Sequence, residues 1–226
     1  MASTDTSIWS PLPKAVLFDI DGTLVDSNYL HVYAWAEAFA ALDVAVDSWR
    51  FHRGLGLDSD MLIDDLLGDR VDELGDEAKT RHSDAYKQLA DRLRPIAGAV
   101  ELLRTLHAAG VRVVLATSAP EDELKILLQV LDCDDAIYAT TSADDVETAK
   151  PKPDVVNVAL ERAGVQASEA LFVGDAVWDM KAAGRAGVRA VGVRSGGIGP
   201  GELRDAGALE IYDDAAAVLD DFTASR

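Results

Sequence analysis

The sequence has few cysteines and few basic residues, and each shortage excludes a class of protein. Cys133 is the only cysteine among 226 residues, so no disulfide can form within the chain, as suits a reducing compartment. Lysines and arginines number 21 against 40 aspartates and glutamates, which gives a net charge of −19. A nucleic acid or an anionic membrane would need a basic surface, so we expect neither as a partner.

Long apolar runs are also missing. No segment approaches the length of a transmembrane helix, and residues 1–9 lack the basic and apolar regions of a signal peptide. We therefore expect a soluble, cytoplasmic protein with a short, loose N-terminus. For its oligomeric state we expect a monomer or a weak homodimer. The length allows one large domain or two small ones with a sizeable core.

Helical and strand patterns alternate from residue 94 onward. Apolar runs predict strands over 111–118, 136–139, 170–173, 190–193 and 210–212, with helices between them. This alternation predicts an α/β fold, with a parallel sheet and helices on both faces. The stretch 28–93 has helical patterns and a predicted loop over 50–57, but no strand pattern. We predict a core of residues 10–27 and 94–226 and an inserted, all-helical domain of residues 28–93.

The chain is organised around residues 14–27, where an apolar run ends in an acidic turn. The run at 15–18 is typical of a buried strand, and Asp19, Asp21 and Gly22 follow it. Alternate strand residues point to one face, so both carboxylates would meet where open α/β sheets bind ligands. Crowded anions need a cation or a proton, and Mg²⁺ prefers oxygen ligands. Taken alone, the stretch could also be a plain acidic turn.

Further polar side chains follow the later strands. Thr117 and Ser118 end the second predicted strand, Lys150 lies in a proline-stiffened loop, and Asp175 and Asp179 follow the strand at 170–173. A parallel sheet places these strand ends at one edge, so we expect the side chains to converge. Carboxylates with Mg²⁺ and a lysine suit phosphoryl transfer, and a carboxylate can itself attack phosphorus.

These residues form four ordered motifs that resemble those of the haloacid dehalogenase superfamily. The motifs are Asp19-Ile-Asp21-Gly-Thr23, Thr117, Lys150 in Lys-Pro-Lys-Pro-Asp, and Gly174-Asp-Ala-Val-Trp-Asp179. They span the whole chain, and the helical insertion resembles the type 1 cap domain of this superfamily. The resemblance implies a Rossmann-like core, an Mg²⁺ cofactor and a phosphohydrolase activity.

The resemblance also implies catalytic roles. Asp19 would be the nucleophile and a Mg²⁺ ligand. Asp21 would protonate the leaving oxygen and then activate water, while its backbone carbonyl binds the metal. Thr117 would hydrogen-bond the transferring phosphoryl group, with Ser118 beside it in the substrate site. Lys150 would offset the charge on the nucleophile and on that group.

The fourth motif would complete the metal site. Asp175 would bind Mg²⁺ directly, and Asp179 would act in or next to its coordination shell. Lys152 competes with Lys150 for the lysine role. The family pattern places its lysine just before the first proline, which favours Lys150 and leaves Lys152 as a solvated loop charge.

Two residues of the insertion are candidates for substrate binding. Arg53 lies in the only basic, glycine-containing stretch of the insertion, and it either reaches the phosphate or carboxylate of the substrate or lies on the surface. His31 shares a helix face with Trp35 and is either functional or simply packed.

The choice of activity depends on Asp21. A halide leaving group needs no proton whereas an alkoxide does, so an acid at this position favours phosphate chemistry. The resemblance implies a phosphatase for a small phosphorylated metabolite, such as phosphoglycolate or a sugar phosphate. A sugar-phosphate mutase is the main alternative, although the usual Glu-Asp of mutases is Gly174-Asp175 here.

Two alternatives are not enzymes. A response-regulator receiver domain would be about half this length, with adjacent acids and no helical insertion. A catalytically inactive binding protein would keep the fold, and only an activity assay separates it from an enzyme.

Overall fold

A parallel sheet with helices on both faces forms the larger part of the protein. The computed structural model describes residues 7–57, 59–146, 148 and 150–226. All strand pairs are parallel, in the order β3-β2-β1-β4-β5-β6. The strands are β1 (Ala15–Phe18), β2 (Arg112–Leu115), β3 (Ala139–Thr140), β4 (Ala170–Gly174), β5 (Arg189–Val193) and β6 (Ile211–Tyr212). The predicted α/β class is confirmed.

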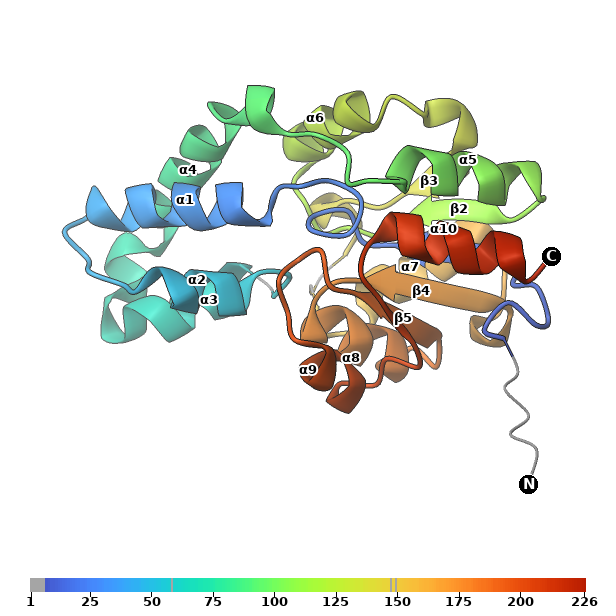
Figure 1. Cartoon of the computed structure of the whole chain (residues 1–226). Coiled ribbons are helices and arrows are strands. Elements are labelled where there is room, and N and C mark those ends of the chain that lie inside the picture. Colours follow the sequence, from blue (N-terminus) through green and yellow to red (C-terminus); the bar gives the residue numbers. More distant parts are fainter. Residues whose placement is uncertain (1–6, 58, 147, 149) are drawn as a thin grey trace.

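Strand β1 lies in the middle of the sheet and is buried on both faces. Its side chains alternate: Val16 and Phe18 join one apolar cluster, and Ala15 and Leu17 join another. The first cluster includes side chains of α5 (Ala99–Ala108), α6 (Glu121–Leu131) and α10 (Ala215–Ala224). The second includes side chains of α7 (Asp154–Ala163), α8 (Val177–Arg185) and α9 (Pro200–Asp205), on the opposite face (Figure 1).

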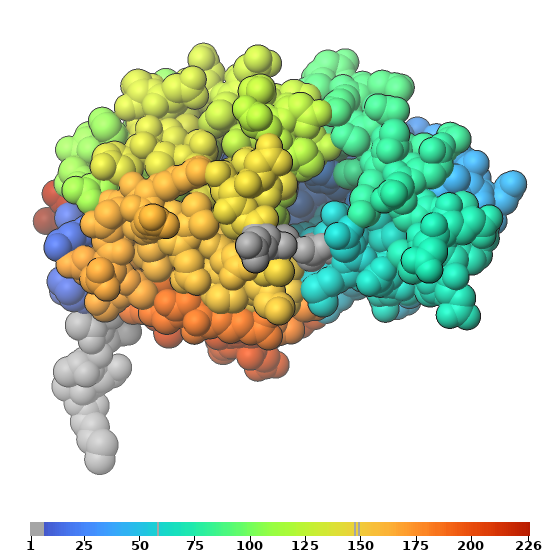
Figure 2. All heavy atoms as spheres, turned by 180° about the vertical axis from the view of Figure 1, so that it is seen from behind, coloured from blue at the N-terminus to red at the C-terminus, as the bar shows by residue number. Residues whose placement is uncertain are grey.

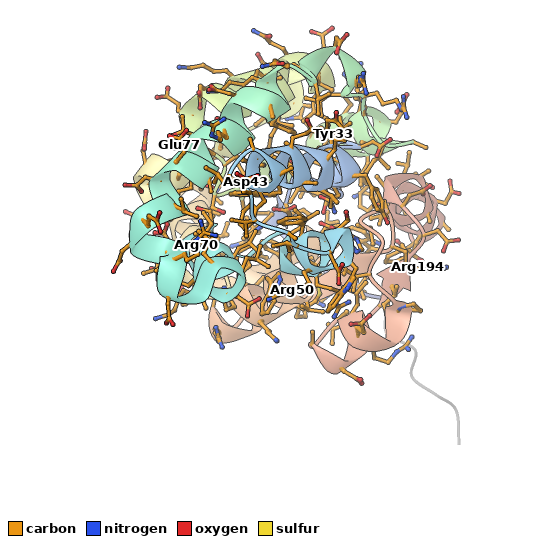
Figure 3. The ribbon with its side chains drawn as sticks, turned by 90° about the vertical axis from the view of Figure 1, so that its left-hand side faces the viewer. Tyr33, Asp43, Arg50, Arg70, Glu77 and Arg194 are labelled. Atoms are coloured by element: carbon orange, nitrogen blue, oxygen red, sulfur yellow. The ribbon has the colours of Figure 1, made fainter. Side chains whose placement is uncertain are left out.

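Four helices form a separate layer beside the sheet, at the end away from α10 and the C-terminus (Figure 1). They are α1 (Asn28–Ala40), α2 (Ser48–Gly54), α3 (Ser59–Leu67) and α4 (Val71–Lys87). Seen from this end, α1 lies between α4 and α2, with Asp43 near the middle of the view and Arg70 and Glu77 to its left (Figure 3). The helices enclose an apolar cluster of their own, which includes Phe39 and Phe51. Within the described part of 28–93 there is no strand, as predicted.

Short 3-10 turns connect these elements. They are η1 (Gly68–Arg70), η2 (Ala90–Arg92), η3 (Asp134–Ala136), η4 (Ala143–Asp145) and η5 (Ala167–Glu169).

The predicted loop over 50–57 is wrong, because residues 48–54 form α2. The helix is short and carries few local signals. It is held in place by Phe51, which is fully buried and packs edge-on against Phe39, with ring centroids 5.2 Å apart. The strand expected at 136–139 also begins later, since η3 occupies 134–136 and β3 starts at Ala139.

The N-terminal segment is less loose than expected. Residues 1–6 lie outside the described part, but Trp9 is buried. Its indole Nε1 donates a hydrogen bond of 2.9 Å to Asp221 Oδ2, and its ring packs against Phe222 of α10. Among the described helices, none is both long and apolar enough to span a membrane.

Candidate active site

Three buried carboxylates meet at the carboxyl ends of β1 and β4. Asp19 follows β1, Asp175 follows β4, and Asp179 lies in the first turn of α8. One carboxylate oxygen from each lies within 4.8 Å of the other two. The parallel pairing of β1 with β4 places these strand ends side by side, and the Asp19 backbone N–H donates to Val173 O at 3.0 Å. Three residues predicted to serve the metal therefore lie together.

Lys150 is the cation of this cluster. Its side chain is 2% exposed, and its Nζ contacts Asp19 Oδ1 and lies 2.7 Å from Asp179 Oδ1. Burial alone would lower the pKa of Lys150. The charges of Asp179 and Asp19 raise it by more than burial lowers it, so the amine stays protonated. Lys152 is exposed to solvent, so the geometry favours Lys150 for the predicted role.

One lysine does not balance three buried carboxylates. Burial raises the pKa of Asp19 to about 7 despite the nearby Lys150. Burial, with the charges of Asp179 and Asp19, raises the pKa of Asp175 well above its ordinary value. The cluster thus carries excess negative charge that a further cation would relieve. All three ligands are oxygens, so the residues fit a hard divalent metal.

Side chains that the sequence analysis did not assign to the site hold Asp175 in place. Thr23 Oγ1 donates to Asp175 Oδ1 at 3.0 Å, and Asn28 Nδ2 donates to Asp175 Oδ2 at 2.9 Å. Gly196 lies directly against the same carboxylate, where a Cβ atom would overlap it. Thr23 belongs to the first motif, but nothing local in the sequence connects Asn28 or Gly196 with a residue so distant in the chain.

Gly174 is also required by its surroundings. The Ala176 N–H donates to Asp179 Oδ2 at 3.0 Å, which folds the Asp179 side chain back over Gly174. A Cβ atom at Gly174 would lie 2.5 Å from Asp179 Oδ2. A larger residue at position 174 would therefore displace this carboxylate.

Asp21 is held by a second set of contacts. Ser27 Oγ donates to Asp21 Oδ1 at 2.5 Å, and His31 Nε2 lies 3.4 Å from the same oxygen. Burial raises the pKa of Asp21, but the hydrogen bonds and the charge of His31 lower it to below its ordinary value. Both of these contacts fall on Oδ1.

The His31 ring connects Asp21 to the helical layer. Its Nδ1 lies 3.1 Å from His82 Nε2, and its ring stacks on Tyr86 with centroids 3.8 Å apart. Burial lowers the pKa of His31, but the hydrogen bond and charge of Asp21 raise it more. Burial, with the charge of His31, lowers the pKa of His82 to about 2, so this ring is neutral and can accept a hydrogen bond. His82 was missed because α4 has a largely polar sequence.

The hydroxyl of Thr117 is positioned next to the carboxylates. Its Oγ1 accepts a hydrogen bond of 3.0 Å from the Ala119 N–H, and its carbonyl accepts one of 2.7 Å from Thr141 Oγ1. The hydroxyl hydrogen is therefore free to donate to a group in front of it. Ser118 follows on the same loop after β2.

A cavity of about 530 Å³ lies in front of these side chains, between the sheet and the helical layer. The surface is hollowed between α4 and the α6 side of the sheet domain (Figure 2). The predicted residues that line the cavity are Asp19, Asp21, His31, Thr117, Ser118, Lys150 and Asp175.

Arg53 is not placed as the substrate-binding hypothesis expected. It does not line the cavity, and its guanidinium pairs instead with Glu202 of α9 on the protein surface. The short α2 helix turns the side chain toward α9, whereas the next residues, 54–57, line the cavity.

Comparison with known proteins identifies the family. The model of the haloacid dehalogenase-like hydrolases matches residues 13–187, which include all four motifs. The protein belongs to this hydrolase family. A phosphoglycolate phosphatase from Rhodospirillum rubrum is 32% identical over 220 residues, covering 92% of this chain and 90% of that protein. A validoxylamine A 7′-phosphate phosphatase from Streptomyces hygroscopicus is 32% identical over 186 residues, covering 80% and 85%.

Two solved structures have the same fold. A hydrolase from Pseudomonas syringae superimposes with a TM-score of 0.88 at 37% identity, covering 93% of this chain and 98% of its own. A β-phosphoglucomutase homologue from Bacteroides vulgatus superimposes with a TM-score of 0.79, covering 93% and 88% of the two chains. At 22% identity, the latter shows the fold alone.

Proposed function

We propose that this hydrolase is a Mg²⁺-dependent phosphatase that hydrolyses a small phosphomonoester through an aspartyl-phosphate on Asp19. The observation that carries the proposal is the position of Asp19, whose carboxylate lies beside Lys150 and borders the cavity together with Asp21 and Thr117. The phosphatases among its relatives support the same reaction class.

In the first step, a carboxylate oxygen of Asp19 attacks phosphorus. The bond between phosphorus and the ester oxygen breaks. Because Asp21 is ionised, it first accepts a proton from the singly protonated phosphate of the bound ester and then gives it to the ester oxygen as that oxygen leaves. Thr117 donates its hydroxyl hydrogen to a phosphoryl oxygen. The protonated Lys150 reduces the repulsion between the attacking carboxylate and the phosphoryl group.

In the second step, Asp21 accepts a proton from water while the water oxygen attacks phosphorus. The bond between phosphorus and Asp19 breaks, which releases phosphate and restores the carboxylate. Asp21 thus acts once as acid and once as base. Ser27 and His31 hold its carboxylate in place for both steps.

Asp19, Asp175 and the backbone carbonyl of Asp21 would hold Mg²⁺, with Asp179 in or next to its shell. When bound, the ion would offset the charge of the phosphoryl oxygens and of the carboxylates. Thr23, Asn28 and Gly196 support this role because they fix the orientation of Asp175.

We propose further that α1–α4 act as a cap that encloses the substrate and limits the entry of water. Hydrolysis is favoured over phosphoryl transfer between sugar positions because Gly174 stands where mutases usually have glutamate. A glutamate there would displace Asp179, given the 2.5 Å separation between its Cβ position and Asp179 Oδ2. We expect a small, soluble metabolite as substrate, a cytoplasmic location, and a monomer or weak homodimer.

The test is phosphate release from a panel of phosphomonoesters, measured with Mg²⁺ and with EDTA. The panel includes phosphoglycolate, sugar phosphates and β-glucose 1-phosphate, with formation of glucose 6-phosphate followed separately. We expect release by the wild type that is lost with EDTA and in Asp19→Asn. The control Asp26→Asn changes an exposed carboxylate that pairs with Arg94, and it should keep the activity. Release that survives both EDTA and Asp19→Asn would refute the proposal, and isomerisation without release would indicate a mutase.

A further inference from the structure

The cavity extends well beyond the catalytic carboxylates. Its volume of about 530 Å³ lies in the range of cavities that hold drug-sized ligands, about 300–1,000 Å³. Much of its lining comes from α3, α4 and the first turn of α6. We call this part the outer wall: Asp60, Leu62, Lys79, Thr80, Ser83 and Glu123. A phosphorylated two-carbon acid would leave most of this space unfilled.

The cations around the cavity are already engaged. Lys150 contacts Asp19 and Asp179. Lys79, the cation of the outer wall, pairs with Asp60. No arginine is among the described residues that line the cavity. A substrate carboxylate is bound best by an arginine fork or by an uncommitted ammonium group.

His31 does not change this balance. Its Nε2 faces Asp21 and its Nδ1 faces His82, so both ring nitrogens have partners within the protein. The ring therefore has no N–H left to donate to a ligand.

Glu123 adds a carboxylate to the outer wall that forms no ion pair among the described residues. Burial raises its pKa, while the charge of His31 and the hydrogen bond from Ser83 act in the opposite direction. Its side chain is buried, and its Oε1 accepts a hydrogen bond of 2.9 Å from Ser83 Oγ, a neutral partner. Thr80 and Ser83 add hydroxyl groups to the same wall. A carboxylate among hydroxyls can accept hydrogen bonds from a polyhydroxylated ligand, but it repels a second carboxylate at low dielectric.

We propose that the outer wall selects phosphomonoesters of neutral, polyhydroxylated compounds, sugars or polyols, and that Glu123 disfavours esters carrying a carboxylate. This inference rests on the proposed phosphatase activity and specifies its substrate class. The proposed substrate preference differs from that of the relatives named for phosphoglycolate, because the glycolate part of that ester carries a carboxylate. Glu123 acts here as a specificity residue, because it contacts the leaving group and not the reacting atoms.

The test uses two matched esters, sorbitol 6-phosphate and 6-phosphogluconate. Both have the same carbon chain and the same phosphate position, and they differ in the far terminus, a hydroxymethyl group or a carboxylate. For the wild type we expect kcat/KM to be roughly tenfold or more higher for sorbitol 6-phosphate, which corresponds to about 1.4 kcal/mol. Each ester is also measured as an inhibitor of p-nitrophenyl phosphate hydrolysis, so a slow substrate still reports its affinity.

Variants assign the discrimination to one side chain. Glu123→Gln removes the charge and keeps an acceptor for Ser83, and it should reduce the ratio between the two esters to within about threefold. The control Glu121→Gln changes an exposed glutamate in the same turn of α6, paired with Lys125, and should keep the ratio of the wild type. A merely structural role for Glu123 would lower both activities together and leave their ratio unchanged.

Two results would overturn the inference: a wild type that prefers 6-phosphogluconate or treats both esters alike, or a Glu123→Gln variant that keeps the full ratio. If the Glu123→Gln variant does not fold, the ratio of kcat/KM between the two esters in the wild type is enough to test the proposed substrate preference. Hydrolysis of p-nitrophenyl phosphate that requires Asp19 supports the phosphatase activity whichever ester is preferred. If p-nitrophenyl phosphate were not hydrolysed at all, the proposed phosphatase activity would be refuted, and the substrate preference that rests on it would fall with it.

Discussion

Acidification should destabilise the protein through His82. This side chain is 9% exposed, its ring stacks on Trp35 with centroids 3.9 Å apart, and its Nε2 faces His31. Burial, and then the charge of His31, lowers its pKa to about 2, whereas the unfolded chain has the ordinary value of about 6.5. Below pH 6.5 the unfolded state therefore binds one more proton than the folded state. Stability falls as the pH falls, by about 1.4 kcal/mol per pH unit well below that value.

Between pH 7 and pH 5, this single group should lower the free energy of unfolding by about 2 kcal/mol. The assay is urea unfolding of wild type and His82→Gln at both pH values. Because the other titrating groups are common to both proteins, they largely cancel, and the loss on acidification should be about 2 kcal/mol smaller in the variant. His107→Gln, which changes an exposed histidine of α5, should behave like the wild type. Equal losses in wild type and His82→Gln would refute the reasoning.

Three further predictions concern single side chains. Phe51→Ala should lower the free energy of unfolding by about 3–5 kcal/mol in urea titrations, because Phe51 is fully buried, whereas Trp49→Ala, 64% exposed, should change it by less than about 0.5 kcal/mol. Gly196→Ala should raise the Mg²⁺ concentration for half-maximal activity about tenfold, since the added methyl group displaces Asp175; an unchanged Mg²⁺ titration would contradict this. Lys150→Met should lower kcat by about 10²–10³-fold in a phosphate-release assay. Lys152→Met changes an exposed lysine, so its kcat should stay within about twofold of the wild type. Similar losses of kcat in both variants would argue against the role of Lys150.

Much of the sheet domain could be predicted from local sequence patterns. The apolar runs at 15–18 and 170–173 predicted strands because only a central parallel strand buries both faces. Helices were predicted between the later strands, and α6 is one of them, because its apolar residues recur with a helical period. The carboxylates of the site followed from the rule that parallel strand ends share one edge.

What the sequence did not reveal depends on contacts between distant segments. The α2 helix is stabilised by the packing of Phe51 on Phe39, and no local signal indicates that contact. His82 meets His31 only because α4 packs along α1. The position of Arg53 depends on Glu202, which lies far along the chain.

The covalent intermediate on Asp19 is the central claim, and it can be measured directly. Asp21→Asn should slow hydrolysis of the intermediate, because no base then activates the water. The variant is mixed with Mg²⁺ and an activated ester such as p-nitrophenyl phosphate, whose leaving group needs little protonation, and is quenched in acid. Peptide mass spectrometry should find one phosphoryl group on Asp19, and none in a protein that also carries Asp19→Asn. Phosphorylation at another residue, or turnover of the ester with Asp19 never modified, would contradict the account.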